Sequence, residues 1–130
     1  MSYQPDLIFY FLRSMVKACV RIQQHVSGMS FEQFIADRKT TDAVERQFQV
    51  LGECSRKIPF RVQKKFKKIP WSSMHRLRNR ISHEFYDVDA EMLWCIIQND
   101  LEKNLAELQE IASNPAALQF LSNPVRKTKY

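Results

Sequence analysis

The sequence contains little glycine and no long apolar run. Only two of its 130 residues are glycine, and no useful length alternates between apolar and polar residues, as a half-buried strand would. Both absences favour helices over sheets. The apolar stretch 7–12 is followed at once by Arg13 and Lys17, which fits neither a membrane span nor a signal peptide. We therefore expect a cytoplasmic protein without a membrane segment.

Cysteine is also scarce. Cys19, Cys54 and Cys95 are far apart in the sequence, and each lies among apolar residues. An odd number with this spacing suits neither a disulfide framework nor a zinc cluster. We expect three free, buried thiols, no structural metal and no cofactor.

Acidic residues are missing from one part of the chain. The segment 55–83 contains ten of the twenty lysines and arginines and no aspartate or glutamate, although the net charge is only +6. Such a block can attract phosphates, but the ordinary role of a basic segment is a solvated surface. Its four closely spaced lysines are candidates for binding an RNA backbone: Lys64, Lys65, Lys67 and Lys68.

Apolar residues recur every three or four positions in four long segments, which predicts four amphipathic helices. The first should end at Gly28, and the second should begin after an Asp42 cap and end at Pro59. Between them, the segment 31–36 should form a short helix capped by Ser30.

The second half of the chain continues this pattern. A short basic helix is expected over 61–68, and Pro70 suits the start of a helix near Trp71. Asp89 is the expected cap of the last long helix, which Pro115 should end.

These helices predict an all-α fold, an antiparallel bundle of four or five helices. We expect residues 1–114 to form one domain and residues 115–130 to form a loosely ordered basic tail.

The segment 77–89 is the best candidate for a catalytic site. Cleavage of RNA without a metal needs a base for the 2′-hydroxyl, an acid for the leaving 5′-oxygen and a cation for the phosphorane. Imidazole can transfer protons near neutral pH, and guanidinium can hold two phosphate oxygens, so His83 and Arg78 are the candidate catalytic pair. Asn79 and Arg80 lie four and three residues before His83, on its helical face, and suit phosphate binding.

The spacing of Arg78 and His83 restricts how one chain can use both. Residues five apart on a regular helix point about 140° away from each other. Either the helix ends before His83, or two subunits combine their motifs. A two-fold dimer would bring two histidines and several arginines into one groove, and we favour this homodimer.

The sequence around this pair resembles the HepT-like HEPN proteins, whose hallmark is an arginine, four residues and a histidine. The resemblance covers residues 29–111, through the matching segments 29–34, 37–40, 42–46, 51–53, 69–71, 77–80 and 98–101, together with His83 and Trp94.

This resemblance implies a HEPN bundle that dimerises, with the active site of a ribonuclease toxin in the groove between subunits. The implied substrate is RNA, either tRNA or mRNA, and the implied antitoxin is a nucleotidyltransferase of the minimal MNT type. Arg78 and His83 match the catalytic pair, and Asn79 matches the polar residue beside it.

One position departs from the family pattern. Members commonly carry a tyrosine two residues after the histidine, which is modified with AMP in antitoxin-controlled members, whereas this chain has Phe85 there and Tyr86 next. On a continuous helix this shift turns the side chain by about 100°. Tyr86 is therefore a candidate modification or supporting site, and the control of activity can differ.

Two alternatives remain open at this point. The first is a noncatalytic subunit that binds a nucleotide or a nucleotidyltransferase through the same basic groove. The second is a helical adaptor in which the motif is a coincidence. RNA cleavage by the native protein separates the enzyme from both.

Overall fold

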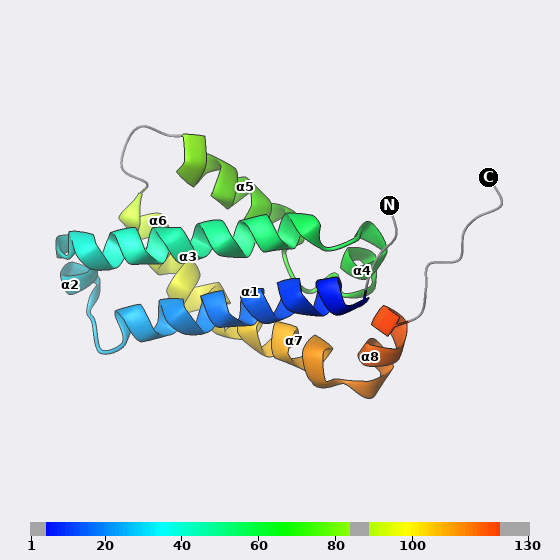
Figure 1. The fold of residues 1–130 in the computed structure, drawn as a ribbon. Coiled ribbons are helices and arrows are strands. Elements are labelled where there is room, and N and C mark those ends of the chain that lie inside the picture. The colour runs from blue at the N-terminus through cyan, green and yellow to red at the C-terminus, as the bar shows by residue number, and fades with distance from the viewer. Residues whose placement is uncertain (1–4, 84–88, 123–130) are drawn as a thin grey trace.

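A computed structural model describes residues 5–83 and 89–122, and every regular element in this part of the chain is helical (Figure 1). The all-α prediction is confirmed. In chain order the elements are α1 (Pro5–Val26), α2 (Phe31–Ala36), α3 (Arg38–Lys57), α4 (Phe60–Lys65), α5 (Trp71–His83), α6 (Ala90–Ile96), the π-helix η1 (Ile97–Leu101), α7 (Glu102–Ser113) and α8 (Pro115–Ser122).

The long helices form the antiparallel bundle that the sequence predicted. α1 lies against α3 in the opposite direction, α5 packs on the other side of α3, and α7 packs on α1 (Figure 1). The continuous segment α6–η1–α7 runs diagonally behind α3 and α1, and it also borders a hollow with α3 and α5 (Figure 1). The short helices α4 and α8 lie at one end of the bundle, and α2 lies at the other.

One apolar core joins these helices. Its largest fully buried side chains come from almost every element: Leu12, Met15, Ile22, Phe34, Val44, Val62, Ile69, Leu93, Leu101, Leu108 and Leu121. Burial of each such side chain contributes about 1.5–3 kcal/mol relative to exposure, before the cost of ordering the chain. No helix in the described part of the chain is both long and apolar enough to span a membrane.

Polar caps fix where the helices begin. Ser30 caps α2 in a reciprocal pair with Gln33, and Asp89 caps α6, as predicted. The predicted start of the second long helix was wrong. α3 begins at Arg38 because Asp37 accepts hydrogen bonds from both the backbone NH and the hydroxyl of Thr40. Asp42 lies inside the helix and pairs with Arg38 at 3.1 Å.

The last long helix contains a π-turn that the sequence did not predict. Its buried residues Leu93, Ile97, Leu101 and Leu105 are each four positions apart. On an α-helix every step of four advances the side chain by about 40°, so this stripe would rotate away from the core. The wider turn of η1 accommodates the spacing and keeps all four residues buried.

α8 shortens the tail that was expected from residue 115. Asn114 ends α7, and its side chain accepts from the backbone NH of Ala116 at 2.8 Å, so Pro115 occupies the first turn of a new helix. Ala117 and Leu121 of this helix are buried in the core. The segment 123–130 lies outside the described residues, and for it the tail remains a prediction.

The cysteines divide into two environments. Cys19 and Cys54 are buried, as predicted, and burial raises the pKa of the Cys19 thiol to about 12. The prediction of a buried thiol was wrong for Cys95, which is exposed. It lies two residues from both Leu93 and Ile97, so it points away from the buried face of α6.

Candidate active site

The candidate site is built where α5 crosses α3 at a glycine. A Cβ atom on Gly52 would lie 2.3 Å from the Cβ of Arg78 and 2.5 Å from the carbonyl oxygen of Met74. Only glycine therefore allows the two helices to approach this closely. The crossing presses the base of the Arg78 side chain against α3.

Glu53, the next residue of α3, orients the head of Arg78. Its Oε2 lies 3.0 Å from Nη2 of Arg78, and its Oε1 accepts a hydrogen bond from Arg56 at 3.1 Å. The hydrogen bond from Arg56, followed by the charge of Arg78, lowers the pKa of Glu53. Glu53 thus pairs with two arginines of its own chain, one on α5 and one on α3.

Asn79 holds the other side of the Arg78 guanidinium. Nη1 of Arg78 donates to Oδ1 of Asn79 at 2.9 Å, and Nδ2 of Asn79 lies 3.4 Å from Nε2 of His75. Because an amide nitrogen can only donate, Nε2 of His75 is the acceptor in this contact. Nδ1 of His75 is buried and has no hydrogen-bond partner among the described residues. A series of polar contacts thus joins Glu53, Arg78, Asn79 and His75.

The contact of His75 with Asn79 was not predicted from the sequence. His75 lies outside the segment 77–89 that the sequence singles out as the candidate site. The available signal was its spacing of four from Asn79, which puts both side chains on one face of a helix.

His83 is the last residue of α5 and is exposed. Since the helix continues through it, the alternative that the helix ends before His83 is excluded. Arg78 and His83 therefore point about 140° apart and lie about 7 Å apart along the axis. The guanidinium of Arg78 is drawn toward α3, away from the face that carries His83.

The remaining residues of the predicted site are not gathered around Arg78. Arg80 reaches α6, where its Nη1 lies 3.4 Å from the sulfur of Met92. Tyr86 falls outside the described residues. The four lysines belong to α4 and the turn that follows it, near the amino-terminal end of α5, whereas His83 ends that helix.

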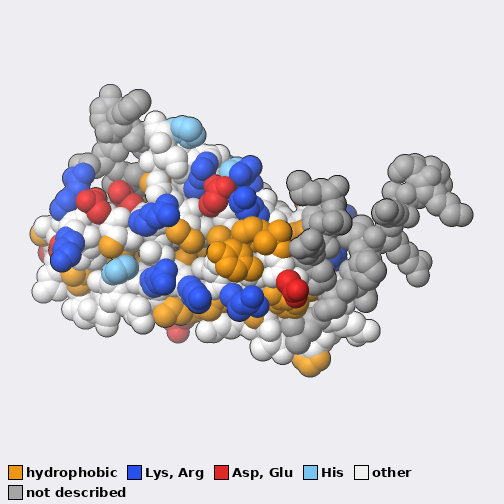
Figure 2. Space-filling model, in the orientation of Figure 1, with side chains coloured by type: hydrophobic (Ala, Val, Ile, Leu, Met, Phe, Trp, Pro, Cys, Tyr) orange, Lys and Arg blue, Asp and Glu red, His pale blue; other side chains and the backbone are white. Residues whose placement is uncertain are grey.

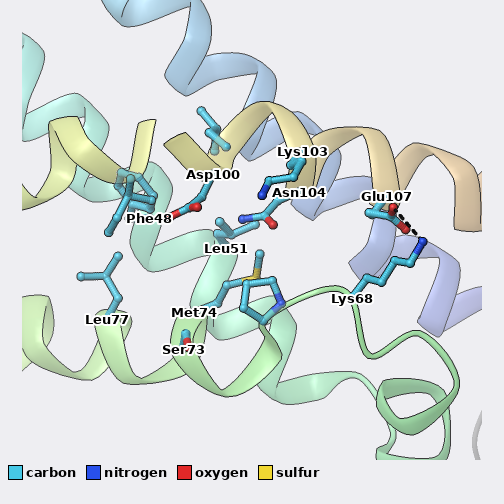
Figure 3. Close-up of a pocket in the computed structure, with 13 residues that line it drawn as sticks. Phe48, Leu51, Lys68, Ser73, Met74, Leu77, Asp100, Lys103, Asn104 and Glu107 are labelled. Atoms are coloured by element: carbon cyan, nitrogen blue, oxygen red, sulfur yellow. Dashed lines mark ion pairs between the residues drawn. The ribbon is translucent and has the colours of Figure 1, made fainter. Parts of the chain in front are cut away.

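Two hollows lie between α5 and α3. The smaller, about 270 Å³, lies on the Arg78 side and is lined by Arg46, Gln49, Val50, Glu53, Cys54, Arg78 and Ser82. The larger, about 520 Å³, lies between α3, α5 and the segment η1–α7, with Phe48, Leu51, Met74 and Leu77 among its apolar lining (Figure 3).

Charge distinguishes these two hollows. In the larger one, the lysines 68 and 103 are balanced by Asp100 and Glu107, and Lys68 pairs with Glu107 at 3.9 Å (Figure 3). The smaller hollow has two arginines and one carboxylate. The excess positive charge at the smaller hollow makes it the better site for a phosphate.

Comparisons with known proteins place the chain among ribonucleases. Residues 15–112 match the family model described as Ribonuclease HepT-like. A protein of Methanocaldococcus jannaschii named "Putative RNase MJ0127" is 31% identical over 101 residues, which are 78% of this chain and 84% of that protein. "Probable ribonuclease HepT" of Thermococcus cleftensis is 32% identical over 91 residues, 70% of this chain and 83% of that protein.

No solved structure matches the chain. The matched region 15–112 contains both helices of the crossing, with Gly52, Glu53 and Arg78, and it contains His83. Since the family model covers most of the chain, the protein belongs to the HepT-like ribonuclease family.

Proposed function

We propose that the protein is a metal-independent endoribonuclease that acts as a homodimer and serves as the toxin of a toxin–antitoxin pair. Membership of the HepT-like family supports the ribonuclease activity. The observation that carries the finer proposal is the fixed Arg78 guanidinium on a helix that continues to an exposed His83.

Each residue has a distinct chemical role in this proposal. His83 transfers protons to and from the ribose and leaving-group oxygens, and Arg78 stabilises the phosphorane. Asn79 and Arg80 position the phosphate. The contacts with Glu53 and Asn79 hold the Arg78 guanidinium in position before the substrate binds. This reduces the reorganisation needed in the transition state.

A dimer supplies the second proton-transfer group that one copy lacks. One chain offers a single His83, on a different face from Arg78, whereas cleavage needs both a base and an acid. Two copies related by a two-fold axis provide two histidines for one phosphate.

The surface of the bundle supports association of two copies. Figure 2 shows apolar side chains gathered in the middle of the face formed by α1 and α3, among lysines and arginines. On α1, Leu7 and Tyr10 are about half exposed, at 50% and 57%. An exposed apolar patch of this kind is typical of an interaction surface.

The toxin role and the antitoxin are supported by the resemblance alone. The proposed partner is a nucleotidyltransferase of the MNT type. Because Phe85 stands where other members have the modified tyrosine, Tyr86 is proposed as the modification or supporting site. Incubation with such a partner and ATP, followed by peptide mass mapping, tests whether AMP is attached to Tyr86.

The central experiment is cleavage of total RNA by the purified protein in EDTA. We expect cleavage by the native protein and its loss in both His83→Ala and Arg78→Ala, compared at equal dimer content. Intact RNA with the native protein, with or without the nucleotidyltransferase, would favour the noncatalytic partner subunit instead.

A mixing experiment tests the two-copy site. If one phosphate needs both copies of His83, a dimer with one native and one His83→Ala subunit is inactive. After subunit exchange with a ninefold excess of His83→Ala, only about a tenth of native subunits are in native dimers, so activity should fall to about a tenth. Unchanged activity per native subunit would mean that each copy acts alone.

A further inference from the structure

We propose that a hollow at the amino-terminal end of α5 binds an unpaired base of single-stranded RNA. In this proposal Phe60 provides the stacking surface, and Lys64 and Lys67 contact the flanking phosphates. The hollow measures about 380 Å³, and these three residues line it together with Ser72 and Ser73 of α5. The inference rests on the proposed ribonuclease function and specifies the form of RNA that it takes.

Phe60 is the first observation that points to a ligand. Its exposed fraction is 71%, larger than that of Leu7, Tyr10 or Ile35, which are the other exposed large apolar residues of the described chain. A side chain so exposed contributes little to the core. An aromatic ring open to solvent can instead stack on a base, whatever the sequence of the RNA.

The turn that carries Phe60 is held firmly. Nε2 of Gln63 donates to the carbonyl oxygens of Ile58 at 2.9 Å and Ser55 at 3.2 Å, which ties α4 to the end of α3. Pro59 further restricts the backbone immediately before the ring. A base would therefore meet a ring whose backbone is already ordered, which lowers the entropic cost of binding.

The charge around the ring suits a polyanion. Nζ of Lys64 lies 5.6 Å from the centre of the Phe60 ring, Lys67 lines the same hollow, and no aspartate or glutamate lines it. The larger cleft on the other side of α5 differs because its two lysines are balanced by two carboxylates.

The structure also divides the four lysines into two pairs. Lys64 and Lys67 line the hollow with Phe60. Lys65 lies over the ring of Phe120 in α8, and Lys68 pairs with Glu107 in α7. Only the first pair is placed to contact RNA stacked on Phe60, so the second pair provides a control of equal charge.

One face of α5 connects this hollow with the proposed catalytic histidine. Ser72, Arg76, Asn79 and His83 are spaced by four, three and four residues, so their side chains follow one face of the helix. About 16 Å of helix separates Ser72 from His83. A short single strand could lie along this face with one base on Phe60 and a neighbouring phosphate near His83.

The test is binding of a fluorescent single-stranded 2′-O-methyl RNA, which lacks the free 2′-hydroxyl and so is not consumed. Anisotropy at several salt concentrations gives the affinity and its salt dependence. Phe60→Ala should weaken binding by about fivefold to a hundredfold, and Phe60→Trp should restore it. The double variant Lys64→Ala/Lys67→Ala should also reduce the salt slope by about 1.4.

Three results would overturn the proposal. They are native affinity in Phe60→Ala, an equal loss of affinity in the control Lys65→Ala/Lys68→Ala, and equally tight binding of a duplex of the same length. The assay does not depend on catalysis. If Phe60→Ala still cleaves and binds RNA like the native protein, the ribonuclease function stands and the Phe60 site is refuted. If the native protein cleaves no RNA but its RNA binding requires Phe60, the Phe60 site stands and the ribonuclease function is refuted.

Discussion

Replacing Gly52 with alanine tests whether the crossing of α3 and α5 creates the site. Propensity alone predicts a more stable protein, because alanine is favoured over glycine within a helix by about 0.8–1.0 kcal/mol. The structure instead predicts that Gly52→Ala makes the protein less stable. The added Cβ would approach the Cβ of Arg78 to 2.3 Å and the carbonyl oxygen of Met74 to 2.5 Å.

Neither atom can move away by a change of rotamer, since one is the base of a side chain and the other is backbone. Carbon atoms pack at about 3.5–4.0 Å, so α5 would have to move away from α3 by about 1 Å. Overpacking of this kind costs about 1–3 kcal/mol or more. After the gain in propensity, we expect a net loss of about 1–2 kcal/mol, and the Arg78–Glu53 contact of 3.0 Å should lengthen.

Urea unfolding and RNA cleavage measure the two consequences. Gly52→Ala should unfold at lower urea and cleave RNA more slowly even at temperatures where it is fully folded. Gly28→Ala is the control, because its backbone φ of +76° is strained for alanine while no atom lies within 4 Å of the new Cβ. A Gly52→Ala protein more stable than the native one, with normal cleavage, would refute the reasoning.

Three further substitutions or measurements test neighbouring parts of the structure. His75→Ala should lower kcat about twofold to tenfold with little change in fold, because Asn79 loses its hydrogen-bond acceptor. His75→Gln should partly restore kcat. Single-turnover cleavage measures both effects, and an unaltered rate in His75→Ala would contradict the prediction. Glu53 has a lowered pKa in the folded protein, so its contribution to stability is present above about pH 4.3 and is lost as the pH falls through the lower folded value. Unfolding free energy in Glu53→Gln should therefore fall less steeply in acid than in the native protein, and parallel curves would argue against the pairing. With a thiol reagent at pH 8, Cys95 should react first and Cys19 only after unfolding, as peptide mapping would show, whereas simultaneous labelling would contradict the burial of Cys19.

Much of the fold could be predicted because local chemistry and packing agree along the chain. The apolar spacing identified the long helices, and Ser30 and Asp89 cap helices because their side-chain oxygens satisfy free backbone NH groups. Gly52 also carried information, since a glycine inside an apolar helical stripe indicates a close helix crossing. The structure identifies α5 as the partner in that crossing.

The errors arose where two local signals were equivalent. Asp37 and Asp42 are both good caps by type, and only the two hydrogen bonds with Thr40 decide between them. Cys95 has apolar neighbours in sequence but lies on the outer face of α6. The π-turn depends on how far a stripe with four-residue spacing can rotate before it leaves the core, and this depends on the helices that surround it.

The site was harder to predict than the fold because its contacts join residues distant in sequence. Glu53 and Arg78 are separated by 25 positions, and no local pattern relates an acid on one helix to an arginine on another. The five-residue spacing did predict how Arg78 and His83 are oriented, because both lie on one continuous helix. At this spacing the two side chains of one copy cannot share a helical face. Contacts within the chain thus fix the orientation of Arg78 toward α3, while His83 stays on an exposed face. We propose a second copy as the source of the missing proton-transfer group, and the mixing experiment with His83→Ala tests this directly.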